Sequence, residues 1–157
     1  YNDKNQLSKK EYIQFGQVYT TWLFEYDEKS NKVSETQTSG TMGNSVTKYK
    51  YDDKSFLFQE DKTNNTIGKE ERINYKYNEK GLVIEKKTKA YYFNTTITLT
   101  YTYNDRGKLT KLYEKSSNGV SSITLYEYND NGLLISDTWE SSISKTPQKT
   151  TYQISFE

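Results

Sequence analysis

Apolar and polar residues alternate along several stretches of the chain. The clearest stretch is 97–103, in which Ile, Leu and Tyr occupy every second position and Thr fills the positions between them. The same period of two runs through 22–26 and 73–77. Successive side chains of a β-strand point to opposite faces of a sheet, so this period is typical of a strand with one half-buried face. The pattern therefore predicts strands in these three stretches.

A triplet of Tyr, then Asn or Asp, then Asp or Glu recurs along the whole chain at steps of 25 or 26 residues. We call its tyrosines the anchor tyrosines; they are Tyr1, Tyr26, Tyr51, Tyr77, Tyr103 and Tyr128. Two residues before an anchor comes another aromatic ring, and four residues after it comes Gly, Ser or Asn. Six residues after it comes an aliphatic residue, except in the second repeat, where Val33 follows one place later. The chain thus contains six repeats, which start near residues 1, 26, 51, 77, 103 and 128.

Each repeat contains two sets of turn signals. After the anchor, Asn or Asp can hydrogen-bond to its own backbone, and the residue four places on tolerates a left-handed conformation. A second set of breakers falls about midway between anchors, at 39–44, 62–66, 94–95, 116–119 and 144–148. Two strands of about eight to ten residues and two turns then fill a repeat and leave no room for a helix.

The predicted fold is all-β, with tandem 25–26-residue β-hairpin repeats in an extended antiparallel meander sheet of about 12 strands, twisted or curled because strand twist accumulates. Residues 1–157 are expected to form a single β-repeat array that is part of a longer chain. One face is predicted to carry a ladder of stacked rings and aliphatic side chains, and the other Lys, Glu, Thr, Ser and Asn.

Composition changes this picture in two ways. The chain has 16 Tyr, two Trp and six Phe, so its apolar surface is largely aromatic and burial is expected to be shallow. It has no His and no Cys, which excludes His-dependent nucleophilic triads, thiolate zinc sites and disulfides. A net charge of +1 gives no field that gathers nucleic acid or anionic lipid, and no apolar run is long enough to span a bilayer as a helix. We therefore expect no nucleic-acid partner and no transmembrane segment.

The repeated pattern resembles the YD (RHS-type) repeat family. The resemblance is carried by Tyr77-Asn78-Glu79-Lys80-Gly81-Leu82-Val83, Tyr103-Asn104-Asp105-Arg106-Gly107-Lys108-Leu109 and Tyr128-Asn129-Asp130-Asn131-Gly132-Leu133-Leu134. It implies a chain of β-hairpins in a long sheet, often in a bacterial envelope, acting as a shell, stalk or binding surface. The first three repeats depart from the family, since Asn5, Ser30 and Ser55 replace Gly. The composition is also similar to that of short lipoproteins of the Bacteroidota envelope. The resemblance carries no catalytic residue over to this chain.

Acidic side chains are the only remaining candidates for catalytic groups. Asp52, Asp53 and Asp130 lie in predicted turns, and Glu70 and Glu71 are neighbours on a strand that should face opposite ways, so a glycosidase pair is not predicted. Oxygen ligands at 129–132 could suit calcium, but their spacing matches neither an EF-hand nor a β-roll, so a simple turn is predicted there. Lys and Tyr alternate at 48–51, which places them on opposite faces rather than in a single-strand nucleic-acid groove. We predict a protein that is not an enzyme, with no metal and no cofactor.

Exposed rings are the remaining candidate for a binding site. The candidate partner or ligand contacts are Trp22, Tyr91, Tyr92, Phe93 and Trp139. Three successive rings at 91–93 cannot all face one side of a strand, so at least one should be exposed or contact a partner. The leading hypothesis is a scaffold or binding subunit in the bacterial periplasm or at the cell surface, lipid-anchored outside this sequence. It would dock onto a protein such as an outer-membrane or secretion assembly. The alternatives are a carbohydrate-binding module and a fragment of an RHS-type toxin shell.

Overall fold

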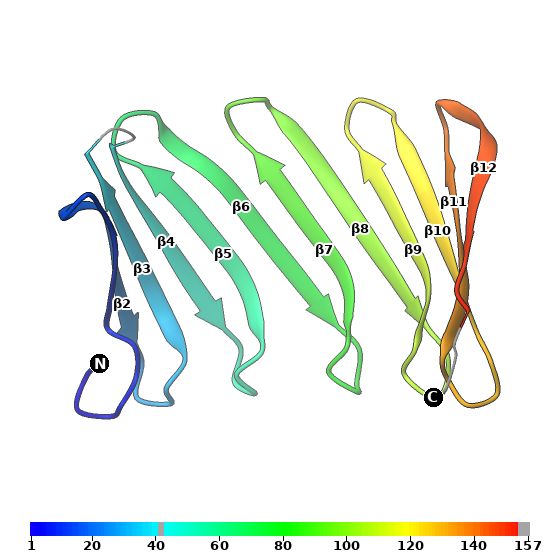
Figure 1. Cartoon of the computed structure of the whole chain (residues 1–157), viewed down its shortest axis with the longest axis horizontal. Helices are drawn as coiled ribbons and strands as arrows, with labels where there is room; N and C mark the ends of the chain where they lie inside the picture. Colours follow the sequence, from blue (N-terminus) through cyan, green and yellow to red (C-terminus); the bar gives the residue numbers. More distant parts are fainter. Residues whose placement is uncertain (41–42, 154–157) are drawn as a thin grey trace. The chain divides into compact units, whose positions relative to one another are not determined.

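The computed structural model describes residues 1–40 and 43–153, and within them it contains strands and turns without a helix. The strands are β1 (Lys9–Gln14), β2 (Gln17–Tyr26), β3 (Lys32–Ser39), β4 (Gly43–Tyr51), β5 (Leu57–Asn64), β6 (Gly68–Tyr77), β7 (Val83–Ala90), β8 (Thr95–Tyr103), β9 (Leu109–Ser116), β10 (Ser121–Tyr128), β11 (Leu134–Ser141) and β12 (Ser144–Thr151). They follow one another in chain order in one antiparallel sheet that is not closed (Figure 1). The predicted all-β meander of hairpins is confirmed.

Contacts between residues divide the chain into two units, which we describe separately. The first unit comprises Tyr1–Asn74 and Lys89–Asn94, and the second comprises Tyr75–Thr88 and the described residues from Thr95 on. In the first unit the register pairs Phe24 with Glu35 and Tyr49 with Glu60. In the second unit Tyr101 pairs with Leu112, which in turn pairs with Thr124. In these cross-strand pairs, a ring on one strand therefore lies opposite a shorter or polar side chain on the next strand.

The turn after each anchor tyrosine is called the anchor turn. In all six repeats, the Oδ1 atom of the Asn or Asp that follows the anchor accepts a hydrogen bond from the backbone N–H four residues further on. In the fifth repeat, Asn104 Oδ1 accepts hydrogen bonds from the backbone N–H groups of Arg106 and Lys108, at 3.1 and 3.0 Å. The residue four places after the anchor has a positive φ each time: Asn5 58°, Ser30 70°, Ser55 65°, Gly81 75°, Gly107 74° and Gly132 76°. The predicted turn chemistry is confirmed, including the left-handed Asn and Ser that replace Gly.

Replacing Ser30 with Gly is expected to stabilise the protein by about 0.5–1 kcal/mol, because a Cβ is disfavoured at positive φ by somewhat more than Gly adds to the entropy of the unfolded chain. Urea unfolding midpoints measure this. The reverse change, Gly107→Ser, should destabilise by a similar amount, since a Cβ at Gly107 would meet its nearest neighbour, Leu82 Cδ1, at an ordinary 3.7 Å and the cost is conformational. An unchanged midpoint in Ser30→Gly would contradict the strain assigned to this position.

Hydrogen bonds between successive repeats run in both directions. Anchor tyrosines donate their hydroxyl to the carbonyl of a residue 19 or 20 positions earlier, at 2.8–2.9 Å: Tyr26 to Leu7, Tyr51 to Lys32, Tyr103 to Val83 and Tyr128 to Leu109. In the opposite direction, Arg106 Nη1 donates to the carbonyl of Asp130 at 2.9 Å and Lys80 Nζ to that of Asp105 at 3.2 Å. These bonds join successive repeats within each of the two units.

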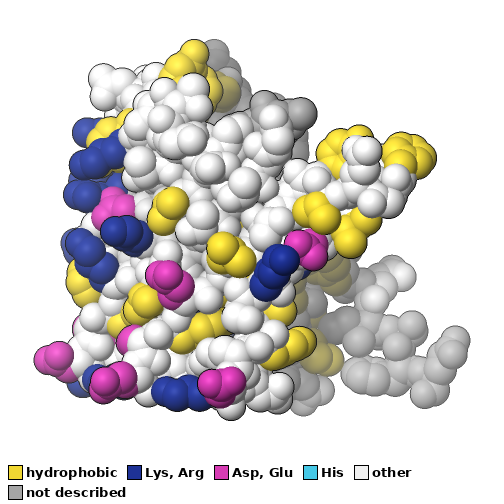
Figure 2. Space-filling view, turned by 90° about the vertical axis from the view of Figure 1, so that its left-hand side faces the viewer, with side chains coloured by type: hydrophobic (Ala, Val, Ile, Leu, Met, Phe, Trp, Pro, Cys, Tyr) yellow, Lys and Arg dark blue, Asp and Glu magenta, His cyan; other side chains and the backbone are white. Residues whose placement is uncertain are grey.

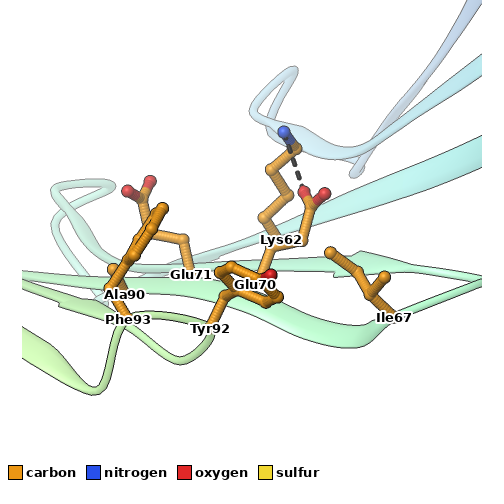
Figure 3. A pocket seen from close by; sticks show the side chains of 7 residues that line it. All are labelled: Lys62, Ile67, Glu70, Glu71, Ala90, Tyr92 and Phe93. Carbon is orange, nitrogen blue, oxygen red and sulfur yellow. Dashed lines mark ion pairs between the residues drawn. The ribbon is translucent and has the colours of Figure 1, made fainter. Parts of the chain in front are cut away.

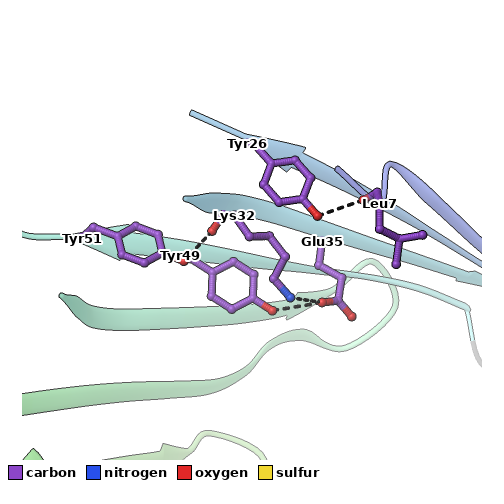
Figure 4. Close-up of polar contacts among 6 residues, drawn as sticks. All are labelled: Leu7, Tyr26, Lys32, Glu35, Tyr49 and Tyr51. Atoms are coloured by element: carbon purple, nitrogen blue, oxygen red, sulfur yellow. Dashed lines mark hydrogen bonds and ion pairs between the residues drawn. The ribbon is translucent and has the colours of Figure 1, made fainter. Parts of the chain in front are cut away.

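The rings do not form a simple stack. The Lys32 ammonium lies 5.5 and 4.5 Å from the ring centroids of Phe24 and Tyr49. The same ammonium forms an ion pair with Glu35 at 2.6 Å, and the Tyr49 hydroxyl donates to that carboxylate at 3.1 Å (Figure 4). Burial disfavours the charged form of Lys32 and by itself would lower its pKa. The hydrogen bonds to Glu35 and Tyr49 outweigh this effect, so the pKa of Lys32 is raised above its ordinary value. The predicted ring ladder is therefore corrected here, because a cation fills the space between rings on non-adjacent strands.

Burial is shallow, as the composition predicts. Among the described residues no hydrophobic side chain is fully buried, and the buried residues are Ser34, Ser45, Asn64 and Ser136. Figure 2 shows charged and hydrophobic side chains intermixed on the side of the molecule that it presents. A single layer of strands buries little, so the stability of the sheet rests on cross-strand pairs and the bonds between repeats.

The turn predicted at 144–148 lies elsewhere. β11 ends at Ser141 and β12 begins at Ser144, so this turn comes earlier and Pro147 lies within a strand. The prediction took proline as a turn signal. Proline lacks an N–H donor but is tolerated in an edge strand, and β12 is the last strand of the sheet.

Candidate functional site

The two predicted tryptophans lie singly within the sheet. Trp22, on β2, pairs with Lys10 of β1 and Gln37 of β3, and the Lys10 ammonium lies 5.1 Å from its ring centroid. Trp139, on β11 in the second unit, pairs with Thr124 and Gln148. Both are half-buried by these neighbours. Each is part of the sheet surface and neither belongs to the cluster described next.

The structure brings the other three predicted residues together at one turn. Residues 91–94 form the turn between β7 and β8, where Asn94 has a φ of 47° and donates its backbone N–H to the Tyr91 carbonyl at 3.2 Å. The turn predicted at 94–95 is thus displaced toward the rings. Tyr92 and Phe93 are 76% and 75% exposed, with their rings edge to face at 5.1 Å. The expectation that at least one ring is exposed holds for two of them.

The third ring has a different environment. Tyr91 is half-buried, and the ammonium groups of Lys69 and Lys89 lie 5.6 and 5.0 Å from its centroid. Its backbone N–H donates to the carbonyl of Glu70 at 2.9 Å. Tyr91 therefore holds the turn to β6, while the next two rings project from it.

Tyr92 and Phe93 form one wall of a pocket of about 300 Å³ within the first unit (Figure 3). Its lining residues are Lys62, Ile67, Glu70, Glu71, Ala90, Tyr92 and Phe93. Lys62 Nζ and Glu70 Oε2 form an ion pair at 2.8 Å, although that oxygen has no well-directed hydrogen bond. Ile67, from the turn between β5 and β6, is 56% exposed. The site combines apolar surface, two rings and charged groups of both signs.

The pocket depends on an irregularity that alternation along a strand does not predict. Lys62 pairs with Glu71 and Thr63 pairs with Lys69, so Glu70 is an extra residue of β6 without a partner on β5. This β-bulge allows Glu70 and Glu71 to line the same pocket. The prediction that these neighbours face opposite ways is therefore wrong at this place, because the bulge breaks the alternation.

The turn at 91–94 also departs from the other distal turns, by which we mean the turns farthest from the anchors. Fourteen residues after an anchor, Asn65, Ser117 and Ser142 each donate a backbone N–H to the carbonyl of the strand residue 21 positions earlier. Their side-chain oxygens accept the N–H of that same residue at 3.0 Å. Tyr91 occupies the equivalent position and keeps the first bond, but its side chain replaces the oxygen acceptor with a ring. This repeat gives up a structural hydrogen bond where the aromatic cluster begins.

The other acidic groups are used in turns. Asp52 Oδ1 accepts the N–H groups of Lys54 and Phe56 at 2.9 and 2.8 Å. A hydrogen bond from the Asn31 side chain lowers the pKa of Asp27 in the equivalent turn. In residues 1–40 and 43–153, no group of three or more acidic, His or Cys side chains is placed to hold a metal ion. The same residues include no helix with the length and apolar character to cross a membrane.

No protein-family model matches the sequence, and no curated protein matches it. Solved structures do resemble it. The chain superposes on the crystal structure of TcdB2-TccC3-Cdc42 with a TM-score of 0.69 and 16% identity over 87% of its length. It superposes on TcdB2-TccC3 without its hypervariable C-terminal region with a TM-score of 0.59 and 13% identity over 91%. It spans 8% and 9% of those two chains.

A third similar structure is closer to this chain in length. A porin-like protein from Bacteroides uniformis gives a TM-score of 0.50 and 12% identity, with 96% of this chain and 84% of that chain covered. At these identities the three similarities show a shared β-hairpin repeat fold alone.

Proposed function

We propose that this protein is a non-enzymatic β-hairpin repeat scaffold of the YD type, which works in a bacterial cell envelope by docking onto a protein partner. The observation that carries the proposal is that the polar groups which recur in each repeat serve the structure of the sheet. Anchor tyrosines, turn carboxamides and turn cations are engaged in bonds within and between repeats. What breaks the repeat is a surface pocket with two exposed rings, and aromatic side chains are enriched in protein-recognition surfaces.

Cross-linking in the native envelope tests this proposal. The full-length protein, carrying an affinity tag, is cross-linked before solubilisation, purified and identified by mass together with its attached proteins. One protein in fixed stoichiometry with the tagged chain is the expected result. Recovery of a bare monomer from cross-linked envelopes, with the tagged protein confirmed to be there, would count against docking.

A second candidate function has a specific observation in its favour. The first two similar structures match most of this chain but are more than ten times longer, so we also consider that the repeats form part of a large RHS-type toxin shell. The mass of the native polypeptide distinguishes the two. A polypeptide many times heavier than 18.5 kDa, with the repeats continuing on both sides, favours the shell. A short lipoprotein favours the scaffold.

A further inference from the structure

The apolar part of the pocket is largely open to solvent. The distal turns at Phe15, Ile67 and Ile143 each expose one large apolar side chain, whereas the turn at 91–94 exposes two adjacent rings, Tyr92 and Phe93, which form a larger continuous hydrophobic area. The repeat also loses a side-chain acceptor at Tyr91. Where a locally consistent sequence breaks its own rule at a structural cost, a functional site is the usual reason.

The charges in the pocket favour a cationic occupant. Glu70 is balanced by Lys62, but the Glu71 carboxylate has no ion-pair or hydrogen-bond partner in the part of the chain that the structure describes. The lysines over Tyr91 are not among the lining residues. The pocket thus offers one unpaired negative charge beside two exposed rings, and a cation gains from both at once.

Its size limits the occupant further. A volume of about 300 Å³ lies at the lower end of the range for ligand pockets, which suits one or two side chains. An arginine suits the chemistry best, because its planar guanidinium stacks on a ring and donates two parallel hydrogen bonds to a carboxylate. Ile67 and Ala90 add apolar wall on which a neighbouring hydrophobic side chain can lie.

We propose that this pocket is the docking point for a segment of the partner protein that presents an arginine next to an apolar residue. The guanidinium would lie against the Tyr92 and Phe93 rings and bind the Glu71 carboxylate. This inference rests on the proposed docking function and adds the class of segment that is recognised.

The first test is an NMR titration of the chain with acetyl-Leu-Arg-Leu-amide and with the same peptide carrying citrulline, a neutral residue of nearly the same shape. We expect shifts of backbone amides at 67–71 and 90–93, and binding of the arginine peptide about tenfold tighter than that of the citrulline peptide. Phe93→Ser and Glu71→Gln should each weaken the arginine peptide about tenfold.

Ile143→Ser is the matched control. Ile143 is a 77% exposed residue at the distal turn between β11 and β12 and is not among the residues that line this pocket, so its replacement should leave binding unchanged. Unperturbed amide spectra elsewhere establish that each variant is folded. Equal binding of the two peptides, shifts at other residues, or stronger shifts of these amides by maltohexaose than by the arginine peptide would overturn the proposal.

The cross-linking experiment separates this inference from the proposed function. If the native partner is captured equally by the wild type and by Phe93→Ser, the pocket assignment fails and the scaffold function stands. If no partner is captured but the arginine peptide binds with the expected selectivity, the docking function fails and the chemistry of the pocket stands. Loss of capture in Phe93→Ser but not in Ile143→Ser supports both.

Discussion

Tyr103→Ala is expected to lower the free energy of unfolding by about 2–3 kcal/mol, because it removes both a half-buried ring and a hydrogen bond between repeats. The hydroxyl of Tyr103 donates to the Val83 carbonyl at 2.8 Å. Tyr103 also lines a groove of the second unit, together with Leu82 and Ile84. Chemical denaturation followed by tyrosine fluorescence measures the loss.

Tyr103→Phe separates the two contributions. It keeps the ring and removes the hydrogen bond, so a loss of about 1 kcal/mol is expected. Tyr92→Ala is the control, since a side chain that is 76% exposed should change stability by no more than about 0.5 kcal/mol. Equal stability of Tyr103→Phe and the wild type, together with a small loss in Tyr103→Ala, would mean that the repeats are not joined through this tyrosine.

Raising the pH should unfold the protein steeply above about pH 10, the ordinary pKa of tyrosine. Burial raises the pKa of Tyr49, Tyr101 and Tyr103, and a hydrogen bond to Asp137 raises that of Tyr152. A group whose pKa is higher in the folded state contributes stability that is complete below its unfolded pKa and is lost as the pH rises through the folded pKa. The raised pKa of Lys32 acts in the same direction.

Acid should also destabilise the protein, through carboxyl groups whose pKa is lower in the folded state. The pKa values of Asp27, Asp61 and Glu127 are lowered, so their contribution is present above about pH 4 and is lost in acid. The chain has no His to titrate between these limits, so stability should be flat from about pH 6 to pH 9. Circular dichroism against pH tests this, and Tyr101→Phe should move the alkaline midpoint upward. A fall in stability near neutrality would contradict this account.

The features that could be predicted from the sequence are those that depend on residues close together in the chain. The anchor turns follow from Asn or Asp and a left-handed residue three positions later, and all six were found. The strand predicted at 97–103 lies within β8 because its alternation is undisturbed. Such features need no information about which strands meet.

What could not be predicted depends on pairing across strands. The bond from Tyr103 to Val83 joins residues 20 positions apart, and no local pattern encodes it. The bulge at Glu70 arises from the register between β5 and β6, so the pocket could not be assembled from alternation alone. The run of rings at 91–93 did signal an exposed surface, but the carboxylates beside it became candidates only through this register.

The two-way bonds between repeats also bear on how such a chain can evolve. A duplication or loss of one whole repeat keeps anchor hydroxyls such as that of Tyr103 within reach of a carbonyl 19 or 20 positions earlier, and turn cations such as Arg106 within reach of the next turn. A change of length by a single residue within a strand would instead exchange the two faces beyond it. Gene rearrangements in steps of whole repeats are therefore the tolerated ones, and arrays of different lengths can arise without the invention of a new contact.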